Sequence, residues 1–155
     1  MEKAEKLKEI SELASFLNDS IEQRGGQNKI VYNKNVSDFL NSQLNSRDFK
    51  EWSQDLSVSE TELNYVLEYM ASLSFISAWY HLTGDKAKRD KAAHSCSTVI
   101  SSLGKDPEKV MMKYLEFERF WRQVMKDEGV APRNLRLLGF ILLTIFIIIL
   151  IVLIF

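Results

Sequence analysis

Residues 137–155 form an uninterrupted apolar run, LLGFILLTIFIIILIVLIF, with no charged residue and a single hydroxyl at Thr144. At 1.5 Å per residue, a helix over this run would be about 28 Å long, close to the hydrocarbon thickness of a bilayer. A core helix of a soluble domain needs a polar face, and this run has none. It therefore predicts a transmembrane anchor, with lipid-facing residues that include Leu137, Phe140, Ile145, Ile149 and Phe155.

The flanking sequence predicts the topology of this anchor. The N-terminus, MEKAEKLKEISEL, is charged and amphipathic and lacks the apolar core of a secretory signal. The expected arrangement is a single-pass tail anchor. Arg133 and Arg136 precede the apolar run, so the positive-inside rule places the preceding residues in the cytosol. A bacterial inner membrane and an endoplasmic reticulum fit this topology equally well.

The residues before the anchor are enough for one domain with a substantial core. Their fold class is predicted to be all-α, because the whole chain has only two prolines and six glycines. Its 20 basic and 21 acidic residues nearly balance, which disfavours a general nucleic-acid-binding protein. The single cysteine, Cys96, cannot form an internal disulfide, which suits a reducing cytosolic location.

Hydrophobic periodicity and helix-end signals predict four clear helices. Gly25-Gly26 ends the first, Ser59-x-x-Glu62 is a capping box that opens the second, and Asp106-Pro107 opens the last. The second is apolar on more than one side, which is typical of the central helix of a bundle. The predicted helices cover residues 2–24, 60–82, 86–103 and 107–128.

Residues 27–57 are ambiguous. The segment KIVYN, 29–33, predicts a short extended piece, after which Asn35 is a candidate N-cap of a helix. Phe49, Trp52 and Leu56 indicate either another short helix or a packed loop. The expected architecture is a four- to five-helix cytosolic bundle, followed by a single C-terminal transmembrane helix. Its expected divisions are a bundle over 1–128, a juxtamembrane hinge over 129–136 and an anchor over 137–155.

The helix predicted over 107–128 has a wide aromatic face with two interpretations. The face can pack into the core, or it can lie against a partner or the bilayer surface. The residues concerned are Phe117, Phe120, Trp121 and Arg122.

Sequence motifs give little support for conventional catalysis. The chain has two histidines and contains no HExxH, CxxC or acidic metal loop, so no metal is expected. It also contains no G-x-S-x-G and no P-loop, which disfavours hydrolase and nucleotide chemistry. No cofactor is expected.

One short pattern does carry chemistry. Arg89-Asp90-Lys91-Ala92-Ala93-His94 has the spacing R-x4-H and resembles the motif of HEPN-superfamily ribonucleases, which are small helical bundles. The resemblance implies that Arg89 and His94 cluster across a dimer interface and cleave RNA without a metal. A histidine can move the 2′-hydroxyl proton and an arginine can hold the scissile phosphate.

Basic residues beside the motif fit both this hypothesis and a simpler one. Lys86, Lys88 and Lys91 would give a local patch for an RNA backbone. In the alternative interpretation they form a solvated helix surface, and His94 turns toward the core.

Three functional hypotheses follow. In the first, a membrane-bound helical domain self-assembles or recruits a protein partner, and a ring of copies perturbs the bilayer. In the second, the protein is a membrane-tethered HEPN-like ribonuclease. In the third, it is a small subunit of a larger membrane complex. The expected partners are membrane lipid, a second copy or another protein, and RNA in the second hypothesis.

Overall fold

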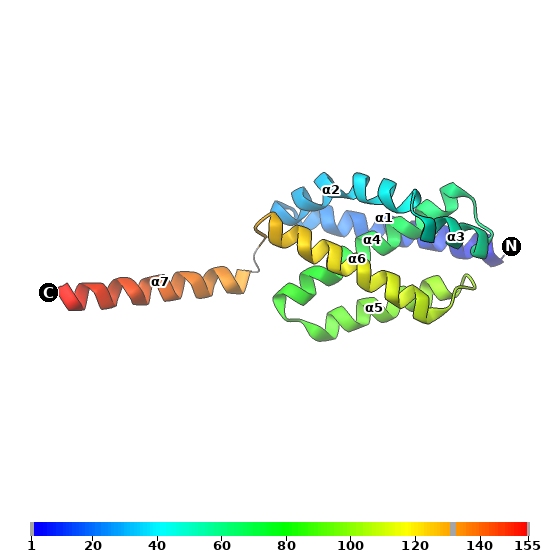
Figure 1. Ribbon diagram of the computed structural model, residues 1–155. Helices are drawn as coiled ribbons and strands as arrows, with labels where there is room; N and C mark the ends of the chain where they lie inside the picture. Colours follow the sequence, from blue (N-terminus) through cyan, green and yellow to red (C-terminus); the bar gives the residue numbers. More distant parts are fainter. Residues whose placement is uncertain (1, 131–132, 155) are drawn as a thin grey trace.

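The computed structural model describes residues 2–130 and 133–154, with side chains over 2–130 and 139–154. Within these residues every regular element is a helix, which confirms the all-α prediction. Helices α1 to α6 form a bundle, and α7 extends away from it (Figure 1). In chain order they are α1 (Glu2–Arg24), α2 (Gly26–Leu44), α3 (Arg47–Leu56), α4 (Glu60–Thr83), α5 (Lys86–Ser101), α6 (Pro107–Asp127) and α7 (Arg133–Ile154).

Helix α4 is the centre of the bundle, as its sequence predicted. Every residue from Tyr69 to Ala78 is buried, and α1, α2, α5 and α6 all pack against this helix. The small residues Ala71, Ser74 and Ala78 are fully buried, so neighbouring helices can approach it closely. A helix that is buried on all sides needs apolar or small residues at each of these positions.

The predicted helix ends agree closely with the observed ones. Ser59 and Glu62 form the capping box: the Ser59 hydroxyl accepts from the Glu62 amide at 3.2 Å, and the Glu62 carboxylate accepts from the Ser59 amide at 2.7 Å. Gly84 ends α4 with φ 78°, a left-handed conformation that glycine adopts without steric cost. Asp106 caps α6, with Pro107 as its first helical residue.

The extended piece predicted at 29–33 is wrong, because these residues lie within α2. Val31 and Tyr32 are buried in the core. The Tyr32 hydroxyl lies 2.9 Å from the Ser72 hydroxyl and 3.0 Å from Asn18 Oδ1. Asn35 is not an N-cap either: it lies inside α2 and its side chain donates to the Val31 carbonyl at 2.8 Å. Residues 2–130 therefore contain six helices rather than four or five.

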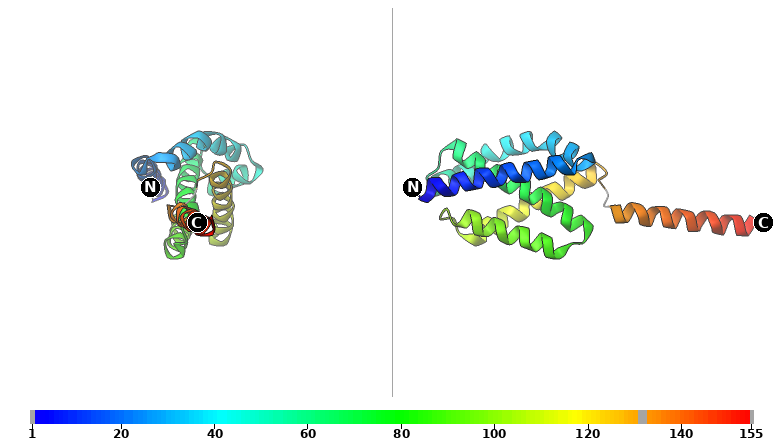
Figure 2. Two further views of the ribbon diagram at one scale, coloured as in Figure 1. Left: turned by 90° about the vertical axis from the view of Figure 1, so that its left-hand side faces the viewer. Right: turned by 180° about the vertical axis from the view of Figure 1, so that it is seen from behind.

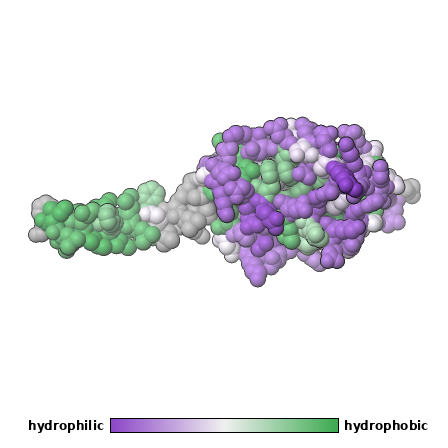
Figure 3. Space-filling model, in the orientation of Figure 1, coloured by the Kyte–Doolittle hydropathy of each residue, from purple (hydrophilic) through white to green (hydrophobic). Residues whose placement is uncertain are grey.

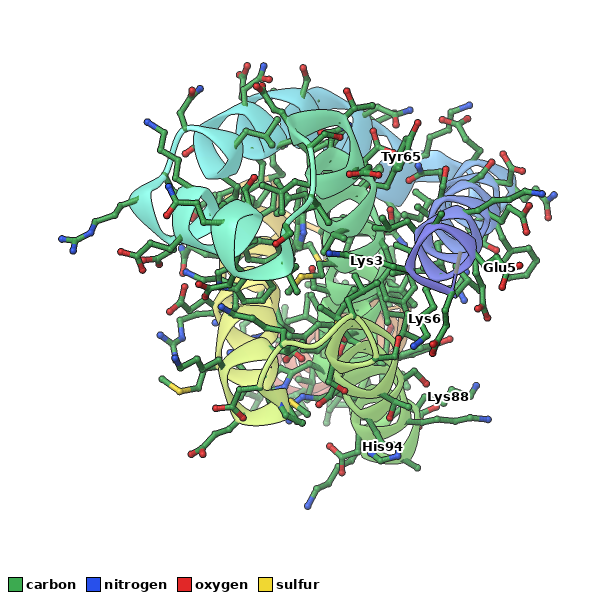
Figure 4. All side chains as sticks on the ribbon, turned by 90° about the vertical axis from the view of Figure 1, so that its right-hand side faces the viewer. Lys3, Glu5, Lys6, Tyr65, Lys88 and His94 are labelled. Carbon is green, nitrogen blue, oxygen red and sulfur yellow. The ribbon has the colours of Figure 1, made fainter. Side chains whose placement is uncertain are left out.

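The two ends of the bundle differ. The α1–α2 turn, the α4–α5 turn and the end of α6 all lie at the end from which α7 leaves (Figures 1 and 2). At the opposite end, Lys3 of α1 donates to the Ser57 carbonyl at 3.3 Å, and Lys6 donates to the Ser102 carbonyl at 3.1 Å. Figure 4 views the molecule from this second end.

Helix α7 begins at Arg133, inside the stretch expected to be a hinge. Its described side chains are apolar apart from Thr144, and they are exposed on every side of the helix. They form a continuous apolar surface, in contrast to the mostly hydrophilic face that the bundle presents in the same view (Figure 3). Within the described part of the chain, no helix reaches the combined length and apolar character taken as the mark of a membrane span.

Candidate functional site

Arg89 and His94 point to different sides of α5. Five positions along a helix correspond to a rotation of about 140°. Arg89 turns toward α6, where its Nε donates to Glu118 Oε1 at 3.0 Å. His94 is exposed at the outer edge of α5 (Figure 4). The alternative in which His94 turns toward the core is wrong, and one chain does not bring these two side chains together.

The three lysines expected to accompany this motif are all exposed on α5. Lys88 Nζ lies 3.5 Å from Asp85 and 5.5 Å from the centre of the Tyr80 ring. Lys86 lies one position after the cap of the helix, and Lys91 lies one turn beyond Lys88. They remain accessible to an anionic partner.

The structure reveals a polar cluster at the α7 end of the bundle that the sequence did not predict. Its centre is Glu118 of α6, whose side chain is only 1% exposed. One carboxylate oxygen accepts from Arg89, and the other accepts from the Ser77 hydroxyl at 2.8 Å. These contacts join α4, α5 and α6 through a single carboxylate. A buried carboxylate needs such partners, because removing a charge from water is costly.

His81 and Arg122 complete this cluster. Arg122 Nη1 lies 3.0 Å from His81 Nε2, and His81 Nδ1 lies 3.8 Å from Glu118 Oε1. Because a guanidinium can only donate, His81 must accept at Nε2 and carries its proton on Nδ1, facing the carboxylate. Burial, followed by the charges of Arg122 and Arg89, lowers the pKa of His81, while Glu118 opposes this shift. These effects favour the neutral imidazole.

We call Ser77, His81, Arg89, Glu118 and Arg122 the Glu118 cluster. Its net charge is that of two guanidinium groups and one carboxylate, so it is positive. Arg89, Arg122 and His81 are each roughly a quarter to a third exposed, whereas Ser77 is buried and directs its hydroxyl to Glu118. The arrangement suits holding three helices together and attracting an anionic group. It leaves no exposed nucleophile among its own residues.

A faint signal for this cluster exists in the sequence. Glu118 and Arg122 are four positions apart, and Glu118 falls at helical spacing among Tyr114, Phe117 and Trp121 of α6. A charged residue on a buried helix face requires a partner. The identity of that partner depends on how α5 lies against α6, and the sequence does not specify this.

The aromatic face of α6 belongs mainly to the core. Trp121 and Phe117 are buried, and Phe120, 37% exposed, stacks on Phe39 with ring centres 4.4 Å apart. Arg122 serves the Glu118 cluster. Of the four residues expected to meet a partner or the bilayer, only Phe120 and Arg122 are accessible from outside.

Four of the five expected anchor residues, Leu137, Phe140, Ile145 and Ile149, fall on α7. Phe140, Ile145 and Ile149 are exposed. Leu137 and Phe155 lie outside the described side chains. Among the described residues, no group of three or more histidine, cysteine, aspartate or glutamate side chains is placed to hold a metal ion.

The HEPN resemblance stays a prediction, since a motif of six residues does not identify a family. Comparison of the chain with models of known protein families, with curated proteins and with solved structures finds no match.

Proposed function

We propose that this protein is a membrane-attached helical adaptor. In this proposal α7 crosses a bilayer, and the bundle α1–α6 lies on the cytosolic side, where it self-assembles or recruits a protein partner. The supporting observation is α7 itself, since its described side chains are apolar on every side and exposed to the surroundings. Exposure of that much apolar surface to water is unfavourable, whereas lipid tails would cover it without cost.

The charge at the adjoining end of the bundle supports the same proposal. Exposed or partly exposed cations lie there, namely Lys86, Lys88, Arg89, Arg122 and Lys126, together with the fewer carboxylates Asp85, Asp90, Asp127 and Glu128. Arg133 and Arg136 follow in the sequence. A bilayer around α7 would place these side chains near its headgroups, and each basic residue near an anionic surface contributes about 1 kcal/mol.

Membrane extraction tests this attachment. The full chain is expressed in bacteria, and membranes are washed with alkaline carbonate, which removes peripheral proteins. The wild-type chain should stay in the membrane pellet. The Ile145→Lys/Ile149→Lys variant should move to the supernatant, because each lysine at the middle of a span costs about 3 kcal/mol. The matched control, Ile145→Leu/Ile149→Leu, should behave as wild type. Retention of the lysine variant would contradict the proposal.

Self-assembly is tested by the mass of the full chain in lipid nanodiscs. A defined dimer or ring would support assembly through the bundle, and dye release from vesicles would then test whether a ring perturbs the bilayer. Membrane attachment raises local concentration, so weak contacts between bundles become effective. A monomer at every concentration would rule out self-assembly. The remaining hypothesis would then be that the bundle recruits another protein, which includes the case of a subunit in a larger membrane complex.

Metal-independent RNA cleavage is the second candidate, and the Glu118 cluster favours it through its two guanidinium groups. Arg89 and Arg122 are partly exposed beside Glu118, where they can hold a phosphate. Because His81 Nε2 already accepts from Arg122, the proton acceptor in this candidate is the exposed His94 of a second copy. Cleavage of single-stranded RNA by the wild type, His81→Ala and His94→Ala distinguishes the possibilities. Loss of RNA cleavage in His94→Ala but not in His81→Ala would support a catalytic role for the R-x4-H motif. Absence of cleavage by the wild type would remove this candidate.

A further inference from the structure

A groove runs along the central helix between α1 and α5. Its volume is about 380 Å³. Leu73, Ile76 and Tyr80 of α4 form its floor, and they lie on one face of that helix over about two turns. One wall is the second half of α1 and the other is the first half of α5. Helices α1 and α5 both pack on α4, so α4 holds the two walls apart.

The walls of the groove carry positive charge. Arg24 lies on the α1 wall, and Lys88 and Lys91 lie on the α5 wall, whereas none of the described residues that line the groove carries a carboxylate. Lys88 extends from α5 on the side of the molecule where α1 lies (Figure 4). The groove between α2 and α6 differs, because Asp38 and Glu116 line it.

Tyr80 joins the two walls at the α7 end. Arg24 Nη2 donates to the Tyr80 hydroxyl at 3.3 Å, and Lys88 Nζ lies 5.5 Å from the ring centre. Both cations are thereby held over the floor. Asp85 lies 3.5 Å from Lys88 Nζ and partly offsets its charge.

The rim of the groove also carries an unusual apolar residue. Phe16 of α1 is 67% exposed, although it lines the groove beside Leu17. In helix-in-groove recognition a bound helix lays its apolar face against apolar surface of the groove, and Phe16 extends that surface onto the rim. A ligand lying in the groove would cover this ring.

We infer that this groove binds an acidic amphipathic helix of a partner protein. Its floor follows helical spacing over two turns, which matches apolar anchors at i, i+3 or i+4 and i+7 of a bound helix. The α1 wall contributes one cation, Arg24, and the α5 wall contributes two, Lys88 and Lys91, which are one turn apart. Carboxylates on successive turns of a bound helix can reach these three cations together. This inference rests on the adaptor function proposed above and specifies the chemistry of the recruited partner.

The test uses the full chain in nanodiscs of uncharged phosphatidylcholine. Ser95, which lines the groove, is replaced by cysteine and labelled with a solvent-sensitive dye. Cys96 stays unlabelled, because it is fully buried and burial raises the pKa of its thiol. The probe is a 16-residue helical peptide with leucines at i, i+3 and i+7 and glutamates beside them. The control peptide carries lysine in place of each glutamate.

The glutamate peptide should shift the dye emission and bind at least tenfold more tightly than the lysine peptide. The Lys88→Glu/Lys91→Glu variant should bind the glutamate peptide at least tenfold more weakly and should bind the lysine peptide instead. The matched control Lys8→Glu/Lys50→Glu changes the net charge by the same amount, at exposed residues outside the groove. It should change the affinity for the glutamate peptide less than threefold.

Three results would overturn the inference. The first is equal binding of both peptides. The second is an equal loss in the two charge-reversed variants, which would indicate a general charge effect. The third is a dye shift without peptide. Such a shift in phosphatidylglycerol nanodiscs would indicate that a lipid fills the groove. Such a shift with rising protein concentration would indicate that a second copy fills it. Membrane extraction is measured separately, so a failure here leaves the test of α7 attachment unaffected.

Discussion

Glu118 lies among aromatic residues of α6, and its carboxylate holds one residue each of α4 and α5. Arg89 and Ser77 contact separate oxygens at 3.0 and 2.8 Å. Because Glu118 is almost fully buried while Arg89 is partly exposed, the carboxylate is the member that depends more on the pair. The carboxylate can exist in the core only while these donors remain in place.

Replacing Glu118 by glutamine should destabilise the fold. The change keeps the shape of the side chain but leaves Arg89 and Arg122 without their counter-charge. We expect the free energy of unfolding to fall by about 2 kcal/mol. This loss is smaller than that for breaking a fully buried ion pair, because Arg89 is partly hydrated. Urea unfolding monitored by circular dichroism measures the loss. Ser77→Ala, which removes one neutral donor, should cost about 1 kcal/mol. A change below about 0.5 kcal/mol in Glu118→Gln would contradict this account of the cluster.

Stability should depend on pH through His81. Its pKa is lowered in the folded protein, so in the pH window just below 6.5 the unfolded chain binds the proton more readily. The contribution of His81 to the free energy of unfolding is therefore fully present above that window and is lost as pH falls through it. His81→Gln should reduce the difference between the urea midpoints at about pH 7.5 and pH 5.5. The control His94→Gln, at an exposed position, should leave that difference unchanged. Identical differences in wild type and His81→Gln would refute the role of His81.

At the scale of elements, local signals predicted most helix ends because those signals act within four residues. Ser59 with Glu62, Gly25-Gly26 and Pro107 all lie at observed ends. A helix after Asn35 was predicted, but the first half of α2 was missed because it is rich in residues that favour strands and turns. Val31 and Tyr32 are buried, and the Tyr32 hydroxyl contacts Asn18 of α1 and Ser72 of α4. Tertiary burial and contacts of this kind outweigh local propensity.

The cap of α4 gives a direct test at this scale. Ser59→Ala removes the hydroxyl that accepts from the Glu62 amide, and it should destabilise the protein by about 1 kcal/mol. Thr61→Ala, an exposed substitution in the same turn, should change stability by less than about 0.5 kcal/mol. Thermal unfolding of both variants beside the wild type measures the two changes. Equal effects would show that the capping box is not what stabilises the start of α4.

The candidate site could be predicted only in part. The R-x4-H pattern drew attention to Arg89, which does belong to the polar cluster. It paired Arg89 with His94, whereas the structure places His81 and Glu118 nearby. These residues are 29 positions or fewer from Arg89 in sequence but lie on other helices. Their proximity follows from the packing of α4, α5 and α6, which hydrophobic periodicity alone does not specify.

At the scale of the whole molecule, the bundle and α7 have opposite surfaces. The bundle buries its apolar residues around α4 and presents charged side chains, whereas the described part of α7 presents apolar side chains on all sides (Figure 3). The cations at the α7 end and the basic groove between α1 and α5 lie in the part of the molecule that membrane attachment would bring closest to a bilayer or to a membrane-bound partner.

Nitroxide labels placed along α7 would show whether this helix crosses a bilayer. Single cysteines replace each residue from 140 to 154 in the full chain, reconstituted in lipid vesicles, and each is labelled with a nitroxide. If α7 spans the bilayer, lipid-soluble oxygen should relax the labels most strongly near the middle of α7, around Ile147, on all faces of the helix. A water-soluble nickel complex should reach only labels near the ends. Access of the nickel complex every three to four residues would instead show a helix with one face in water, and would contradict a membrane-spanning α7.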